Sequence, residues 1–183
     1  MKFTYATDRL TLRVLDPREA RNVLAFEKKN QDFFLPYETD HVPNYLSLEY
    51  QKTLMTAEYN ATLRGSMVRF WIFLRSRPQQ IIGTVSFQGI VRFPEQCCRT
   101  GYRIDQDFAQ QGYMTEALRK GQQIMFEEEK LHRIVARIHP YNSPSRRLVQ
   151  RLGYTLEGLE RRSVLLHGTW QDMERWVLFN PSG

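Results

Sequence analysis

The stretch from Gly101 to Leu118, GYRIDQDFAQQGYMTEAL, constrains the fold more than any other part of the chain. A short apolar strand runs through a polar loop into a helix, whose apolar residues recur every three or four positions from Met114 to Met125. Backbone N–H groups at a helix start lack intrahelical partners, so an anion is favoured there. Gly112 lets the backbone turn tightly and approach a ligand closely. The junction predicts an anion site, although plain strand-to-helix connections share the pattern.

The letters of this loop exclude two well-known nucleotide motifs. The loop lacks the Lys and the Ser or Thr that follow the second glycine of a nucleotide P-loop. It also has one glycine where a dinucleotide fingerprint needs three. The identity of the anion must therefore come from other parts of the chain.

Length and charge narrow the class of protein. A chain of 183 residues suits one hydrophobic core, so we expect a single domain over residues 1–183. The net charge of +6 suits an anionic ligand such as a polyphosphate cofactor, an acidic peptide or ribosomal RNA, although a merely basic surface would look the same. The sequence has no aromatic and basic stacking motif of a known RNA module, so we expect no direct nucleic-acid readout.

Cysteine, histidine and hydropathy patterns point to a cytoplasmic protein without a metal. Cys97 and Cys98 are adjacent, which suits neither a disulfide framework nor a metal site, and we expect reduced core thiols. The four histidines lack metal-ligand spacing; they are His41, His132, His139 and His167. The N-terminal segment has no uninterrupted apolar core, and no run of eighteen apolar residues occurs, so neither export nor membrane insertion is expected.

Hydrophobic periodicity and turn residues predict the order of elements. Asp16 and Pro17 are expected to start a helix, Ser143 and Pro144 a shorter one that ends at Gly153. The predicted helices cover about 17–29, 46–63, 113–127 and 143–152, with an irregular segment at 31–45. The predicted strands cover about 10–14, 68–74, 81–87, 100–104, 134–138, 163–166 and 170–178. This order predicts an α+β fold with one mixed sheet, in which the helix between the fourth and fifth strands makes those two parallel.

Two linked motifs resemble the GNAT superfamily of N-acetyltransferases, in the branch of the RimJ and RimL ribosomal-protein N-terminal acetyltransferases. The first motif is GYRIDQDFAQQGYMTEAL, and the second is HPYNSPSRRLVQRLGYTLEG from His139 to Gly158. LHRIVARI, the FLPYE segment at Phe34 to Glu38 and a closing HGTWQD extend the resemblance over most of the chain. The resemblance implies a GNAT fold, with a mixed central sheet flanked by helices and a V-shaped splay between the fourth and fifth strands.

The resemblance implies acetyl-CoA as the co-substrate. The pyrophosphate would lie on the backbone of Gln110, Gln111, Gly112, Tyr113, Met114 and Thr115. The pantetheine arm would run beside the strand, where backbone groups of Tyr102, Arg103 and Ile104 would bind the arm and the thioester carbonyl. An N–H held there would stabilise negative charge on that oxygen as the amine attacks.

The sequence departs from the superfamily pattern in two places. The loop is usually written Q/R-x-x-G-x-G/A, whereas this chain has Ala109 and Met114 at the first and last positions. Phosphates are held mainly by backbone N–H groups, so these departures affect affinity more than the existence of the site. A tyrosine that protonates the departing thiolate in many members is replaced here by Val149.

In the RimJ and RimL branch the serine of the N-x-x-S motif, instead of a tyrosine, donates to the departing thiolate. The resemblance implies the same role for Ser145. The alternative is that Ser145 only bonds backbone groups in the first helical turn. Asn142 is expected to bond the pantetheine amides, or else only to form the turn. Arg146, Arg147 and Arg151 would reach the CoA phosphates or form a solvated helix face.

A carboxylate, directly or through water, must take the proton of the acceptor amine. Glu38 is the first candidate because it lies in the FLPYE segment on the substrate side, although it could be an ordinary solvated loop residue. Asp172 is the second candidate, and Glu116 is better explained by its position in the first turn of a helix.

The sequence therefore predicts an acetyl-CoA-dependent N-acetyltransferase, in which an amine attacks the thioester directly in a ternary complex. The expected acceptor is a protein or peptide α-amine, such as a ribosomal-protein N-terminus, because its pKa near 8 leaves a usable neutral fraction. Two alternatives stay open: an acetyltransferase of a polyamine, amino acid or drug, and a non-catalytic acyl-CoA-binding or ribosome-associated factor. The sequence leaves the oligomeric state open, a homodimer included.

Overall fold

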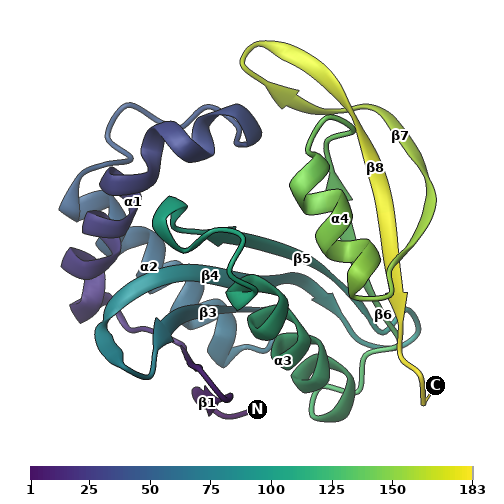
Figure 1. Cartoon of the computed structure of the whole chain (residues 1–183), viewed down its shortest axis with the longest axis horizontal. Coiled ribbons are helices and arrows are strands. Elements are labelled where there is room, and N and C mark those ends of the chain that lie inside the picture. Colours follow the sequence, from purple (N-terminus) through teal and green to yellow (C-terminus); the bar gives the residue numbers. More distant parts are fainter. Residues whose placement is uncertain (183) are drawn as a thin grey trace.

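A computed structural model describes residues 1–182 as one eight-stranded sheet flanked by four α-helices (Figure 1). The strand order is β1-β2-β3-β4-β5-β6-β8-β7. The strands are β1 (Thr4–Ala6), β2 (Leu10–Arg13), β3 (Met67–Leu74), β4 (Arg77–Val91), β5 (Cys97–Ile104), β6 (Arg133–Ile138), β7 (Thr155–Leu166) and β8 (Thr169–Phe179). The helices are α1 (Ala20–Phe34), α2 (Leu48–Leu63), α3 (Tyr113–Glu127) and α4 (Ser143–Arg151), with short 3-10 turns at Pro17–Glu19, Leu35–Tyr37 and Gln106–Phe108.

Strands β5 and β6 are parallel and part from each other halfway along their length. Their pairing runs from Cys97 opposite Arg133 to Thr100 opposite Ala136 and then stops. Beyond that point β5 stays paired with β4 as far as Ile104, so the edge of β5 that faces β6 is open. β5 and β6 correspond to the fourth and fifth strands expected from the sequence. The numbers differ by one because β1 was not among the expected strands. The predicted mixed sheet and its V-shaped splay are thus confirmed.

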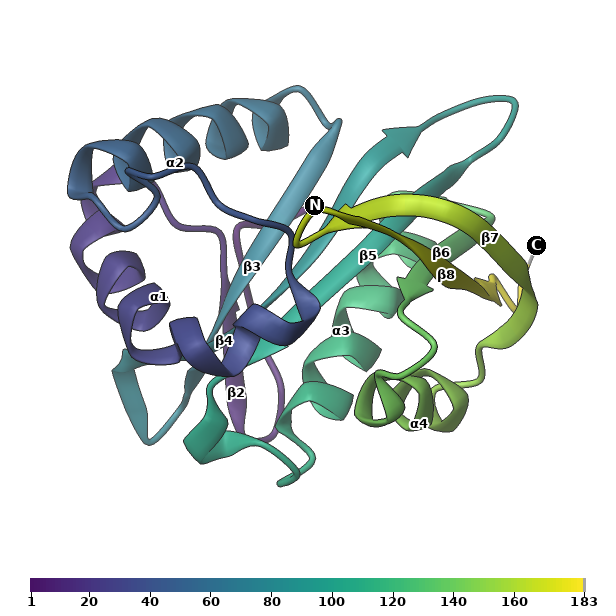
Figure 2. The same cartoon turned by 90° about the horizontal axis from the view of Figure 1, so that it is seen from above.

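The helices cover opposite faces of the sheet, α1 and α2 on one and α3 and α4 on the other (Figure 2). Side chains of a strand alternate between faces, so β3 supplies both hydrophobic cores. Trp71 and Phe73 pack under α1 and α2, whereas Phe70 and Ile72 belong to the larger core beneath α3 and α4. Burial on both faces explains why β3 is apolar almost throughout.

Tertiary contacts shift several boundaries from those expected. α1 runs to Phe34 instead of about Lys29, because Phe34 is buried and packs on Phe26 with ring centroids 5.8 Å apart. The unpredicted β1 forms because it pairs antiparallel with β2. β7 begins at Thr155, well before the expected residue 163, because an edge strand with mostly exposed side chains carries no hydrophobic alternation.

The N-cap of α4 is Asn142 instead of the expected Ser143. The side-chain Oδ1 of Asn142 accepts a hydrogen bond from the backbone N–H of Ser145 at 3.1 Å. Asn and Ser both cap helices well. Asn142 is the N-cap here because its side chain bonds a free N–H of the first turn. In residues 1–182 no helix combines the length and the apolar character needed to cross a membrane.

Candidate active site

A cavity of about 890 Å³ lies where β5 and β6 part. Its walls come from both sides of the sheet: the segment after α1 and strands β3 and β4 on one side, and the starts of α3 and α4 on the other. Because the splay leaves the β6-facing edge of β5 open there, the cavity joins the two faces of the molecule. A ligand could therefore enter from one face and meet a second ligand from the other.

The start of α3 forms the first end of the cavity. Gly112 is its N-cap, with φ of 81°, a left-handed conformation that glycine adopts without strain. The first donor to the helix is the N–H of Glu116, which bonds the carbonyl of Gly112 at 3.1 Å. The N–H groups of Tyr113, Met114 and Thr115 precede it and have no helical acceptor, and all three residues line the cavity. This geometry suits an anion.

Arg9 and Glu116 hold the loop before α3 in place. Arg9 Nε donates to Glu116 Oε2 at 2.7 Å, and its Nη1 donates to the carbonyl of Gln111 at 3.1 Å. Burial alone would raise the pKa of Glu116, but hydrogen bonds from Thr7 and Arg9 outweigh it and hold that pKa below its usual value. Glu116 therefore has two roles. It lies in the first turn of the helix, as expected, and through Arg9 it also anchors the loop before α3.

Of the loop residues Gln110 to Thr115 predicted to hold the cofactor, Gln111 is the one that does not line the cavity. Its carbonyl accepts from Arg9, and its side-chain amide donates to the carbonyl of Asp107 at 2.8 Å. Gln110 does line the cavity, with a positive φ of 60°. The loop therefore turns one glutamine toward the cavity and uses the next to brace itself.

Alternation along β5 points neighbouring side chains to opposite faces. Tyr102 packs against the core beneath α3 and α4, while Arg103 reaches the residues of α1. In an antiparallel pair every second residue turns its N–H and C=O away from the partner strand, so some backbone groups of residues 101–104 face the open edge. Tyr102, Arg103 and Ile104 all line the cavity.

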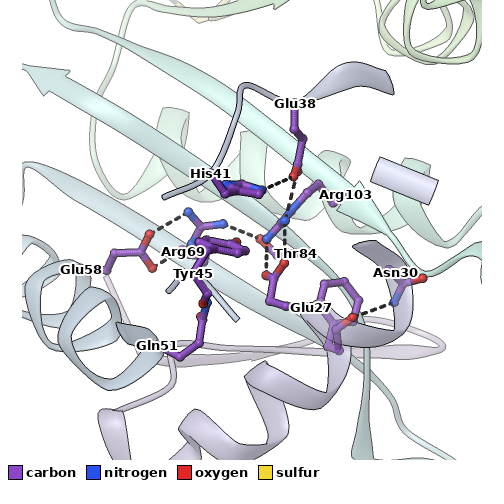
Figure 3. Close-up of polar contacts among 11 residues, drawn as sticks. Glu27, Asn30, Glu38, His41, Tyr45, Gln51, Glu58, Arg69, Thr84 and Arg103 are labelled. Atoms are coloured by element: carbon purple, nitrogen blue, oxygen red, sulfur yellow. Dashed lines mark hydrogen bonds and ion pairs between the residues drawn. The ribbon is translucent and has the colours of Figure 1, made fainter. Parts of the chain in front are cut away.

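Arg103 is the centre of a buried ion cluster (Figure 3). Its guanidinium donates to both carboxylate oxygens of Glu27, at 2.5 and 2.9 Å, and to Glu38 Oε1 at 3.0 Å. Burial by itself would lower the pKa of Arg103, but the two carboxylates outweigh it and raise that pKa. A guanidinium held this way keeps its charge and fixes Glu38 at the cavity wall.

The segment after α1 forms the second end of the cavity, opposite the start of α3, together with Arg103. His41 stacks on Tyr45 with ring centroids 3.7 Å apart, and His41 Nε2 lies 3.1 Å from Glu38 Oε2 (Figure 3). Burial, with a smaller contribution from the charge of Glu27, raises the pKa of Tyr45 to about 12. Among the described residues that line the cavity, Glu38 is the one carboxylate.

α4 brings Asn142, Ser145, Arg147 and Arg151 to the cavity. Asn142 uses its Oδ1 to cap the helix, which leaves its amide nitrogen as a donor. Arg146 instead pairs with Glu174, whose Oε2 accepts from Arg146 Nε at 2.9 Å. Arg147 and Arg151 are thus the two of the three expected arginines that face the cavity.

Val149 and Asp172, two other positions considered in the sequence analysis, do not line the cavity. Val149 is fully buried in the core, so no side chain at this position of α4 donates to the cavity. Asp172 does not line the cavity, and its Oδ1 accepts from the backbone N–H of Arg162 at 2.7 Å. The structure therefore separates Asp172, the second candidate base, from the site and brings Glu38 to it. No cluster of three or more metal-binding side chains occurs within residues 1–182.

Sequence reasoning missed the polar residues of β4 on the cavity wall. Thr84 and Ser86 line the cavity and are almost fully buried. Thr84 accepts from Arg69 Nη1 at 3.3 Å, and Arg69 also pairs with Glu58 (Figure 3). Hydroxyl residues at alternate positions of the otherwise apolar run Ile81 to Phe87 were the available signal.

Residues 9–155 match the family described as acetyltransferase (GNAT) domain. The chain belongs to this GNAT acetyltransferase family. The predicted GNAT membership and N-acetyltransferase class are thereby confirmed. The match covers the loop before α3, the splay of β5 and β6, and α4.

Named GNAT proteins resemble this chain over nearly its full length. It is 32% identical over 170 residues to "Probable N-acetyltransferase YjcK" of Bacillus subtilis, covering 93% of each chain. It is 31% identical over 182 residues to "[Ribosomal protein uS5]-alanine N-acetyltransferase" of Escherichia coli, covering 98% of this chain and 92% of the relative. The crystal structure of ribosomal-protein-S5-alanine acetyltransferase from Vibrio fischeri superimposes with a TM-score of 0.92 at 23% identity, covering 98% of both chains.

Proposed function

We propose that this GNAT protein transfers the acetyl group of acetyl-CoA to the α-amine of a protein or peptide N-terminus. The observation that carries the proposal is the single cavity that joins the start of α3 to Glu38 through the splay of β5 and β6. One end of it suits phosphates and the other holds a carboxylate. The uS5-alanine N-acetyltransferase relative, which is 31% identical, supports an α-amine acceptor.

The residues present fit acetyl-CoA. The N–H groups of Tyr113, Met114 and Thr115 would hold the pyrophosphate, with Arg147 and Arg151 close to the same cavity. The open edge of β5 offers backbone groups to the arm, and the amide nitrogen of Asn142 is a further donor. Ala109 and Met114 differ from the usual family pattern only in their side chains. The groups that would bind the phosphates are backbone N–H groups, which these differences leave in place.

Acetyl-CoA supplies an acyl carbon already activated as a thioester. A backbone N–H on the open edge of β5 would stabilise charge on the carbonyl oxygen as the amine attacks. Ser145 would donate a hydrogen bond to the sulfur, and a thiol with pKa near 8.5 needs little more help to leave. Glu38 would take the proton of the amine, directly or through a water, from its fixed position beside Arg103.

The Glu38 end of the cavity favours a peptide over a polyamine. A polyamine is best bound by several free carboxylates, whereas Glu38 is already paired with Arg103. Phe33 and Tyr37 line this end and are 42% and 48% exposed, so they present apolar surface at an open mouth. An extended chain end can lie against such a surface while its amine reaches Glu38. A ribosomal-protein acceptor would place the reaction in the cytoplasm.

A panel of acceptors tests the proposal. CoA release would be followed with acetyl-CoA and a peptide with a free N-terminal alanine, with spermidine, and with an aminoglycoside. We expect kcat/KM for the peptide to exceed that for either small amine by about tenfold or more, equivalent to about 1.4 kcal/mol of transition-state binding. A preference for spermidine or the aminoglycoside would refute the peptide acceptor, and no turnover with any amine would favour a non-catalytic acyl-CoA-binding protein.

A further inference from the structure

One stretch of the cavity wall has no part in the chemical steps described above. It lies on the sheet face that carries Arg103, which pairs with Thr84 of β4 and holds Glu38 (Figure 3). Two residues further along, Ser86 of β4 pairs with Gly101 of β5, and both share that face because side chains alternate along a strand. All of these residues line the cavity. The cavity therefore continues along this face, away from Glu38.

Gly101 leaves the backbone of β5 uncovered on this face. Arg99 and Arg103 flank it on the same side of the strand, whereas Gly101 presents no side chain there. A Cβ at position 101 would lie 3.2 Å from Ser86 Oγ, which is a tight contact. The pairing of β5 with β6 ends at Thr100, so Gly101 lies where the two strands begin to part. A ligand group can therefore come close to the strand at Gly101.

Ser86 and Gln88 bring neutral hydrogen-bond donors to one side of Gly101. Gln88 Nε2 donates to Ser86 Oγ at 3.1 Å, and the Ser86 hydroxyl donates to the carbonyl of Gly101 at 3.3 Å. The second bond is long for a hydroxyl, so a ligand oxygen can take the Ser86 proton in its place. Gln88 also lines the cavity, and its amide nitrogen carries a second N–H.

Arg137 of β6 brings a positive charge to the same cavity from the other side of the splay. Its Nε donates to Glu160 Oε2, and its Nη2 donates to the carbonyl of Ser163 at 3.3 Å. These two contacts fix the guanidinium and leave its Nη1 without a partner among the described residues. Arg137 thus has free N–H donors at the cavity wall.

The ion network to which Arg137 belongs has one more cation than anions. Arg133, Arg137 and Arg175 share the carboxylates of Glu157 and Glu160. Arg137 is the member of this network that lines the cavity. A carboxylate placed there would balance the extra positive charge, and arginine binds carboxylates through directed, charge-assisted hydrogen bonds.

We propose that Arg137, Ser86 and Gln88 form a subsite for the carboxylate of an acidic residue at the second or third position of the acceptor peptide. The inference rests on the proposed function and deepens it, because it names which N-termini the protein prefers. The three side chains offer N–H and O–H donors, and an ionised carboxylate is purely an acceptor.

The spacing along β5 sets how far this subsite lies from the reacting amine. Arg103 holds Glu38, and Gly101 is two strand positions away from Arg103, or about 7 Å. An extended peptide advances by about 3.3 Å per residue. A peptide whose amine lies at Glu38 would therefore bring its second or third side chain to Gly101.

Four peptides test the preference. Each has an N-terminal alanine and an amidated C-terminus, so that the acidic side chain is its single carboxylate. Two carry Asp or Asn at the second position, and two carry Asp or Asn at the third. We expect kcat/KM for the Asp peptide to exceed that for its Asn counterpart by about tenfold or more at one of these positions. Equal values at both positions in the wild type would overturn the inference, whatever the variants do.

Two variants assign the preference to the cavity. Arg137→Met should bring the Asp-to-Asn ratio of kcat/KM below about twofold, through a higher KM for the Asp peptide. Arg175→Met is the matched control, since Arg175 belongs to the same ion network but does not line the cavity, and it should keep the wild-type ratio. Thermal melts would show that both variants are folded. A ratio that survives in Arg137→Met, or that falls equally in both variants, would overturn the role of Arg137.

Peptide binding separates this inference from the proposed function. Isothermal titration calorimetry would measure the affinity of the same four peptides for protein saturated with CoA. Tighter binding of an Asp peptide that Arg137→Met abolishes, in a protein that acetylates no peptide, would support the subsite and refute only the proposed function. Acetylation of all four peptides with equal kcat/KM and equal affinity would overturn the subsite and leave the proposed function standing.

Discussion

Arg103 Nη1 lies 3.0 Å from Glu38 Oε1, and this ion pair joins the middle of the sheet to the segment that follows α1. Glu27 of α1 holds the same guanidinium from the other side, with only 4% of its side chain exposed. The position of Glu38 at the cavity is therefore set by a buried cluster, and we expect the reaction to need the negative charge of Glu38 there.

Glu38→Gln should lower kcat about 100-fold, because an amide keeps the hydrogen bond to Arg103 but cannot take a proton from the amine. Steady-state kinetics with a peptide acceptor would measure this. Asp172→Asn is the matched control and should leave kcat nearly unchanged, since Asp172 bonds the backbone of Arg162 away from the cavity. The reverse ranking of the two variants would assign the base to Asp172.

Gly112→Val should weaken acetyl-CoA binding by about tenfold or more. The φ of 81° is a left-handed conformation that costs a β-branched residue about 1–3 kcal/mol, and relieving it would displace the N–H groups of the following turn. Isothermal titration calorimetry would measure the affinity, with a thermal melt to show that the variant is folded. An unaltered dissociation constant for acetyl-CoA in a folded variant would show that this loop does not bind the phosphates.

Glu116→Gln should destabilise the fold by about 2 kcal/mol at pH 7, since Glu116 accepts charge-assisted hydrogen bonds from Arg9 and one from Thr7. Its folded-state pKa is lowered, so the stabilisation is complete above the unfolded pKa and is lost as pH falls through the folded pKa. The difference between wild type and variant should narrow below about pH 4.3.

Urea unfolding of both proteins at several pH values would show this narrowing. Glu95→Gln, on an exposed turn, is the control and should change the unfolding free energy by less than about 0.5 kcal/mol. A difference between wild type and Glu116→Gln that stays constant down to pH 4 and below would mean that the charge of Glu116 contributes nothing.

His167, at the tip of the β7–β8 hairpin, should titrate above its usual value of 6.5. Its Nδ1 lies 2.7 Å from Asp40 Oδ1 and its Nε2 lies 2.9 Å from the carbonyl of Leu35, and both contacts require a proton on the ring nitrogen. Both hydrogen bonds are therefore present below the folded pKa, and one of them is lost as pH rises through it, because a neutral imidazole keeps a single N–H. NMR titration would measure the pKa, and Asp40→Asn should return it toward 6.5. A pKa of 6.5 in the wild type would show that the contact does not form in solution.

The start of α3, at one end of the cavity, was predictable because its signals are local. A glycine before an amphipathic helix places Gly112 at the N-cap whatever the rest of the chain does. The roles of Gln110 and Gln111 were not separable in this way. Gln111 gives its carbonyl to Arg9, 102 residues earlier, and its side-chain amide to Asp107, whereas Gln110 lines the cavity.

The other end of the cavity could be predicted only in part. The FLPYE resemblance pointed to Glu38, but nothing in the sequence joins Glu27 to Arg103 across 76 positions. Tertiary packing also lengthens α1 to Phe34, which local propensity alone does not indicate. The catalytic and cofactor roles of these residues stay predictions that the variants above would test.

The most direct test of the account is the position of the acetyl group on a peptide product. The protein would be incubated with acetyl-CoA and a peptide that has a free N-terminal alanine and one internal lysine, beside the same peptide with a blocked N-terminus. Fragmentation mass spectrometry would locate the added acetyl group. We expect acetyl on the α-nitrogen of the free peptide and no product from the blocked one. Acetyl on the lysine of both peptides would contradict it.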